Sequence, residues 1–220
     1  MTSRLYGKQV WTVVALIGAY VLCQAIADVG ATKIVQIGSV TMPGGTFIFA
    51  LTFTLRDMVH KRLGKDWARA AIVVAGSLNI LQAVYLSVVG GLDCPPFYDA
   101  CGAWGSIFAL VPAIAIGSIG AEIISEWIDT DVYHWWRHSH QTRNLPQWTA
   151  VIASNVVSLP LDSLIFGSLA FVLLPPLLGG HAMPFLAAMG VVGGQIMWKA
   201  IVTVVSLPLI YLIKEEAITG

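Results

Sequence analysis

The sequence SNVVSLPLDS at residues 154–163 lies inside a long run of Val, Ile, Leu and Phe, and it carries a carboxylate at Asp162. An ionisable group in a bilayer costs several kcal/mol, roughly 2.5–3.5 on insertion scales, and is tolerated where it faces a polar cavity or a partner. This stretch therefore predicts a membrane-spanning helix with one polar, inward face. The other ionisable residues that interrupt apolar segments are Asp28, Arg56, Asp57, Glu122, Glu126 and Lys199.

The composition excludes an ordinary soluble domain, because 57% of the residues are hydrophobic and only 11% are charged. The formal net charge is zero, so a nucleic-acid partner has no electrostatic support. Three histidines at residues 134, 138 and 140 have helical spacing but no carboxylate or cysteine pattern of a zinc site, and the chain has no phosphate loop. We therefore expect no cofactor and no metal.

Six segments approach the length of about 20 mostly apolar residues that a membrane-spanning helix needs. They are residues 10–27, 46–59, 67–90, 104–128, 148–178 and 184–213. The second is the weakest, since Arg56 and Asp57 shorten its apolar core, and five spans with a re-entrant second segment is the alternative. We expect an all-α integral membrane protein of six transmembrane helices, forming one domain over residues 1–220.

The basic residues are distributed unevenly between the two sides of this six-span arrangement. Lys33 alone falls on one side, and the other side carries Arg4, Lys8, Lys61, Arg62, Lys65, Arg69, Arg137, Arg143 and Lys214. Loops rich in Lys and Arg stay in the cytoplasm, so we expect a multi-pass protein of the cell membrane with both termini cytoplasmic. Two halves of three spans would then have opposite orientations, which permits an inverted repeat with Asp57 and Asp162 in corresponding positions.

Two segments between the spans carry turn and cysteine patterns. Residues 34–42 alternate weakly around Gly38-Ser39, and Gly at the first central position suits a type II′ turn, so a short external β-hairpin is expected. Cys94 and Cys101 fall on the same predicted outer side, where oxidising conditions permit a disulfide. The alternative is two unpaired thiols, and the spacing does not decide between them.

Polar residues gather on single faces of three predicted helices when each residue is turned by about 100°. The stripes are Ser118, Glu122, Ser125, Glu126 and Asp129, then Ser154, Asn155, Ser158 and Asp162, and finally Gln195, Lys199, Thr203 and Ser206. A polar stripe facing lipid is costly, so we expect the three stripes to converge inside the bundle. Small residues at 113, 117 and 121 and at 190 and 194 predict close helix packing within or between protomers, and a homodimer is possible.

Asp162 and Lys199 each lie about 20 Å from the start of their spans at 1.5 Å per residue, which places both near mid-membrane. We expect them to form an ion pair, which would serve either the structure alone or a binding cavity. Asp28 is expected at the outer boundary in contact with solvent, and Ser163 on the far side of its helix. A catalytic function is disfavoured, because no nucleophile–base pair or metal set is visible.

Three blocks of sequence resemble the vitamin-uptake-like transporter family, also known as the queuosine precursor transporters. They are residues 31–57 with the apolar run TFIFALTFTLRD, residues 125–133 (SEWIDTDVY), and residues 154–163 followed by Lys199. The resemblance implies uptake of 7-deazaguanine bases across the bacterial cytoplasmic membrane. The alternative is the substrate-binding subunit of an energy-coupling-factor importer.

A guanine-like edge presents adjacent N–H donors that one carboxylate accepts. We assign this role to Asp162, because it shares a helix face with Asn155 and Ser158 and lies near mid-membrane. Asn155 and Ser158 would then fix the orientation of the heterocycle. The full set of candidate substrate-binding residues is Asp57, Glu122, Glu126, Asn155, Ser158, Asp162, Gln195 and Lys199.

Overall fold

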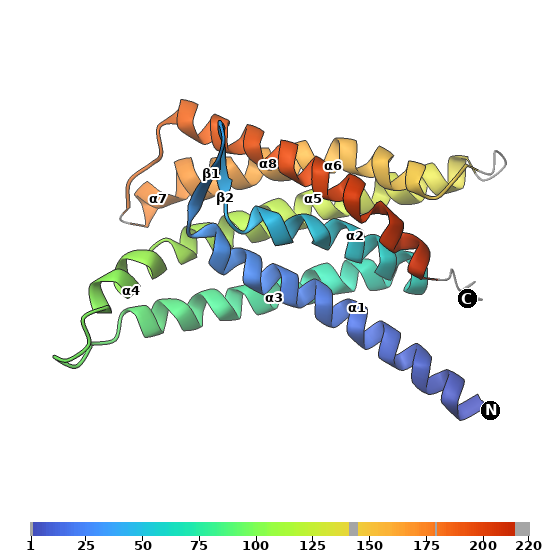
Figure 1. Cartoon of the computed structure of the whole chain (residues 1–220), viewed down its shortest axis with the longest axis horizontal. Helices are drawn as coiled ribbons and strands as arrows, with labels where there is room; N and C mark the ends of the chain where they lie inside the picture. Colours follow the sequence, from blue (N-terminus) through green and yellow to red (C-terminus); the bar gives the residue numbers. More distant parts are fainter. Residues whose placement is uncertain (1, 141–144, 179, 214–220) are drawn as a thin grey trace.

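The computed structural model describes residues 2–140, 145–178 and 180–213, and this part of the chain is mainly helical (Figure 1). The helices are α1 (Thr2–Ala31), α2 (Thr46–Leu63), α3 (Lys65–Gly90), α4 (Cys101–Phe108), α5 (Val111–Ser139), α6 (Trp148–Ser168), α7 (Leu174–Leu177) and α8 (Phe185–Ser206). The remaining elements are the strands β1 (Ile34–Ile37) and β2 (Val40–Pro43), the π-helical turn η2 (Leu169–Leu173) and the 3₁₀ segment η3 (Leu207–Leu212). Arg143 and Lys214, which contribute to the predicted charge asymmetry, lie outside the described residues, as do the side chains of Arg4 and Lys8.

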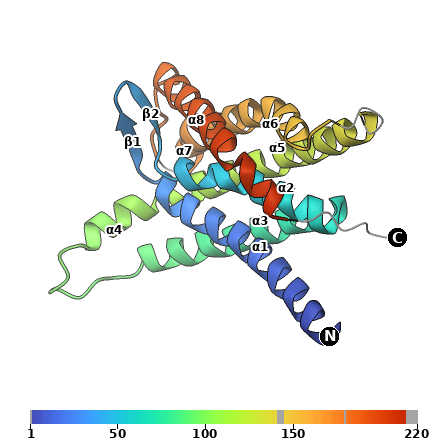
Figure 2. The same cartoon turned by 45° about the vertical axis from the view of Figure 1, so that its right-hand side comes forward.

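The long helices run back and forth along one bundle, as Figures 1 and 2 show. The β-hairpin, α4 and the connection from α7 to α8 lie at one end, which we call the hairpin end. The start of α1, the junction of α2 with α3 and the start of α6 lie at the opposite end. Helices α1, α3, α5, α6 and α8 run along the bundle, and the shorter α2 lies among them.

Five stretches of the described chain are long and apolar enough to cross a membrane: Val10–Ala31, Lys65–Gly90, Cys101–Ser139, Trp148–Leu177 and Phe185–Leu212. They coincide with five of the six predicted spans. The predicted second span, which forms α2, is not among them. Most side chains of this 18-residue helix are buried by its neighbours, including Arg56 and Asp57. Because little of α2 faces outward, its composition does not have to be apolar.

The predicted β-hairpin is present between α1 and α2. Strands β1 and β2 pair antiparallel, with Ile37 opposite Val40 on either side of the two-residue turn. Gly38 has φ 62°, a left-handed conformation that glycine adopts without a steric penalty and that the first position of the turn requires. The hairpin packs against α8: a Cβ atom on Gly194 would collide with the backbone oxygen of Thr41, while Gly190 has open space around it. Gly194 therefore serves the close packing of β2 on α8 within one chain.

Glycine also holds the start of α2 against the end of α1. A Cβ atom on Gly45 would collide with the carbonyl oxygen of Ala27 and would lie 3.0 Å from the backbone nitrogen of Ala31. Helix α5 makes a similar approach, since a Cβ on Gly117 would lie 3.0 Å from Ala170 in η2. The Gly45 contact holds the start of α2 close to the end of α1, beside the site.

Prolines leave α6 intact but shape the chain after its end. The helix continues through Pro160 from Trp148 to Ser168. Pro175 has no backbone N–H, so the carbonyl of Phe171 four residues earlier has no helical donor. The backbone N–H of Met183 donates to that carbonyl at 2.7 Å and so ties the loop before α8 to the π-helical turn.

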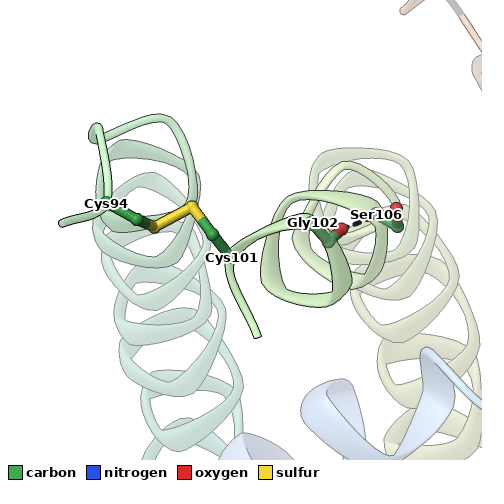
Figure 3. Close-up of a disulfide and its surroundings, with 4 residues drawn as sticks. All are labelled: Cys94, Cys101, Gly102 and Ser106. Atoms are coloured by element: carbon green, nitrogen blue, oxygen red, sulfur yellow. Dashed lines mark hydrogen bonds between the residues drawn. A yellow bond between two sulfur atoms is a disulfide. The ribbon is translucent and has the colours of Figure 1, made fainter. Parts of the chain in front are cut away.

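A disulfide joins Cys94, in the connection after α3, to Cys101, the first residue of α4 (Figure 3). Their Cα atoms are 6.0 Å apart, within the usual range for this bond, so the alternative of two unpaired thiols does not apply. The bridge lies at the hairpin end of the bundle, at the start of α4. Cys23, in α1, is a free thiol and is partly buried.

Candidate functional site

The predicted polar stripes do converge inside the bundle. All residues of the three stripes on α5, α6 and α8 are buried, and large apolar side chains such as Leu81, Val156 and Val205 are exposed instead. The outside of the bundle therefore suits lipid, and the inside holds the ionisable groups. The polar interior has three parts: a pocket near the hairpin end, a hydrogen-bond network between α1 and α5, and an ion-pair cluster around Arg56.

The pocket lies between the end of α1, the start of α2, the first half of α5, the last turns of α6 and the middle of α8. Its polar lining consists of Asp28, Thr46, Ser118, Asp162, Gln195 and Lys199. Phe49 and Phe166 contribute aromatic wall. Three of the predicted site residues, Asp162, Gln195 and Lys199, are thus brought together here.

The expectation for Asp28 was wrong, because its side chain is buried and lines the pocket instead of meeting solvent. The reason lies in the Gly45 contact, which folds the start of α2 back against the last turns of α1. Ser118 of α5 lines the pocket as well. The position of Asp28 at the end of its span suggested exposure to solvent and did not show that α2 buries it.

The predicted ion pair between Lys199 and Asp162 is confirmed, and both side chains are almost fully buried. Ser125 donates its hydroxyl to the other carboxylate oxygen of Asp162 at 3.0 Å. Lys199 Nζ also donates to Ser163 Oγ at 3.3 Å and lies 4.9 Å from the centre of the Phe49 ring. Ser163 is therefore not on the far side of α6, since α8 packs against α6 closely enough to reach both 162 and 163.

A second set of contacts links α1 with α3 and α5. Asn79 donates to Gln24 Oε1 at 3.0 Å, and Gln24 in turn donates to Glu122. The hydroxyl of Tyr20 lies 3.0 Å from Glu122 Oε1 and also contacts Glu126. A phenol carries one hydrogen, so it cannot donate to both carboxylates at once. The carboxyl groups of Glu122 and Glu126 thus share the single hydroxyl group of Tyr20.

The sequence reading missed the α1 members of this network. Tyr20, Gln24 and Asp28 are spaced by four residues, so they share one face of α1. This four-residue spacing within an apolar span was the signal that could have identified them. The signal is weak, because a tyrosine and an amide also occur in spans without a functional site. All three side chains are buried.

The third set surrounds Arg56 of α2, whose side chain has no exposed surface. Its Nη2 donates to Asp57 Oδ1 at 2.8 Å and contacts Asp129 of α5. Ser158 donates to the other oxygen of Asp129 at 2.6 Å. The local charge pair of Arg56 with Asp57 thus extends to α5 and α6.

The predicted site residues are therefore divided among different surroundings. Glu122 and Glu126 belong to the network with Tyr20, and Asp57 and Ser158 belong to the Arg56 cluster. Asn155 lies apart from both, and its two amide atoms are buried without a hydrogen-bond partner in the described part of the chain. Among the described residues there is also no group of three or more His, Cys, Asp or Glu side chains arranged to hold a metal ion.

The comparison with family models matches residues 43–213, more than half of the chain, to the family described as "Putative vitamin uptake transporter". The chain belongs to this family. Uptake of a small molecule by a multi-pass membrane protein is the function that membership implies, and the apolar helices agree with it. No curated protein and no solved structure matches the chain. The match begins at Pro43, so the α1 residues that reach the pocket lie before the matched segment.

Proposed function

We propose that this transporter imports 7-deazaguanine bases, the precursors of queuosine, through the pocket near the hairpin end. The observation that carries the proposal is the composition of that pocket, in which Phe49 and Phe166 stand beside buried polar groups. A planar heterocycle has apolar faces for aromatic walls and polar edges for hydrogen bonds, so it matches both kinds of lining. The sequence blocks that resemble queuosine precursor transporters support the same substrate class.

The remaining candidate residues would line the path from the pocket to the opposite end of the bundle. Glu122 and Glu126 share α5 with Ser125, which donates to Asp162. Asp57, Asn155 and Ser158 would lie closer to the opposite end. Buried ionisable groups that continue beyond a pocket are typical of substrate and proton pathways in membranes. Alternating access would then require the Arg56 cluster to open after the pocket has closed.

Substrate uptake tests this proposal directly. A bacterial host that lacks its own queuosine precursor uptake and lacks the ATPases of energy-coupling-factor importers should accumulate radiolabelled 7-cyano-7-deazaguanine only when the chain is expressed. Uptake in that host indicates that the chain acts alone, whereas uptake that appears only with the ATPases indicates a substrate-binding subunit. If neither host accumulates a 7-deazaguanine while the protein is present in the membrane, the proposed substrate is wrong.

For the topology we propose six spans, with α2 crossing inside the bundle and both termini in the cytoplasm. The back-and-forth course of the helices supports the sixth crossing, and the positions of Lys61, Lys65 and Arg69 near the α2–α3 junction support a cytoplasmic opposite end (Figure 1). We include in the same proposal an inverted arrangement of two three-helix halves, which six spans permit.

We expect the disulfide loop to be outside the cell in this topology. In a Cys23→Ser background, a membrane-impermeant thiol reagent should label intact cells only after the Cys94–Cys101 bridge has been reduced. The triple variant that also lacks Cys94 and Cys101 controls for other labelled proteins. Labelling that requires permeabilised cells would place the loop in the cytoplasm and reverse the orientation.

A further inference from the structure

We propose that Asp28 and Gln195 form the recognition edge of the pocket, and that they select a heterocycle without negative charge. Asp28 Oδ2 would accept a hydrogen bond from an N–H group of the substrate, and Gln195 Nε2 would donate one to a substrate acceptor. The inference rests on the proposed function, because it concerns the same pocket. It adds the chemical condition that a substrate must meet, and it assigns a role to α1, which lies outside the family match.

The two atoms have no hydrogen-bond partner in the described part of the chain, although both are buried. Asp28 is 7% exposed and Gln195 is 1% exposed, and they line the pocket from different helices, α1 and α8. A buried polar atom without a partner is destabilising, so a ligand that supplies the missing partner gains free energy at that atom. An N–H donor on one edge of a ligand and an acceptor on another would satisfy both.

The neighbouring charges in the pocket are already satisfied. Asp162 accepts from Ser125 with one oxygen and from Lys199 with the other. Lys199 is in turn shared between Asp162 and Ser163. This pair has no net charge, so the carboxyl group of Asp28 decides the electrostatic character of the lining. The substrate acceptor role that the sequence suggested for Asp162 is thus better met by Asp28.

When its carboxyl group is ionised, Asp28 makes the pocket discriminate between classes of planar ligand. A 7-deazaguanine has N–H donors on its pyrimidine ring and exocyclic amine, and it has a ring carbonyl as acceptor, so it can satisfy both residues. A carboxylate-bearing heterocycle would place a second negative charge beside Asp28 in a poorly solvated site, where like charges repel strongly. The pocket should therefore reject carboxylate vitamins even when their rings fit between Phe49 and Phe166.

The test is ligand binding to the purified, full-length protein, with 7-cyano-7-deazaguanine as the probe. Asp28→Asn and Gln195→Glu retain the shape of each side chain but remove the charged acceptor and the donor. Each should weaken binding roughly 5- to 150-fold, the range expected for one unmatched buried polar contact. Asp131→Asn is the matched control, since this carboxylate is half exposed and pairs with Lys65 and Arg69 on the surface. It should bind like the wild type.

A competition experiment uses only the wild-type protein, so its result does not depend on whether the variants fold. An excess of a neutral 7-deazaguanine should displace the labelled probe, and nicotinate at the same concentration should not. Displacement by nicotinate, or binding by both pocket variants at wild-type affinity, would overturn the inference and leave the proposed function intact. A wild-type protein that binds no 7-deazaguanine would overturn the proposed function, and this inference with it.

Discussion

Lys199→Met is expected to lower the free energy of unfolding by about 3–5 kcal/mol, because it leaves Asp162 as a buried carboxylate without its cation. Both side chains are at most 3% exposed, so water cannot solvate the charge that remains. Ser125 still donates one hydrogen bond to Asp162, but a neutral hydroxyl does not replace an ammonium group. Asp162→Asn should be destabilising for the complementary reason, since Lys199 is then unpaired.

The double variant Lys199→Met/Asp162→Asn should recover part of this loss, because neither charge remains to be buried. Lys65→Met is the matched control: its partner Asp131 is 53% exposed, and exposed pairs contribute about 0–1 kcal/mol. The stability of all four variants is measured by thermal unfolding of equal amounts of each protein, purified in detergent. Single-variant losses that simply add in the double variant would show that the pair is not coupled.

Arg56→Met is expected to have an effect of similar size, about 3–5 kcal/mol, because Asp57 and Asp129 both contact this one guanidinium. All three side chains have no exposed surface. Removing the arginine therefore leaves two buried carboxylates close together. The second consequence is local: Ser158, which donates to Asp129, would lose the arrangement that orients it.

Arg69→Met is the control for Arg56→Met, because Arg69 makes the same kind of pair with Asp131 at the surface. It should change the stability by less than about 1 kcal/mol. Thermal unfolding of the two variants under one condition gives the comparison. Equal losses from both variants would contradict the buried ion pair, whereas a large loss from Arg56→Met alone supports it.

The sequence by itself determined the helices, the hairpin and the pairing of the two deepest charges. The reason is that each of these depends on local pattern. Apolar length places the spans, Gly38-Ser39 closes the hairpin, and the equal depth of Asp162 and Lys199 makes them the available partners. The polar stripes followed from helical periodicity alone, and the bundle buries every residue of the three predicted stripes.

The tertiary structure alone decided which polar groups face each other. Tyr20 meets Glu122 and Glu126 across more than a hundred residues of sequence, and Arg56 reaches Asp129 across 73. Such contacts depend on how each helix is rotated about its axis and on how closely two backbones approach. The Gly45 contact covers Asp28, and the packing of α8 on α6 brings Lys199 to Ser163. The helical period of one segment contains neither quantity. Which of the buried polar residues line one pocket was therefore visible only once the helices were packed.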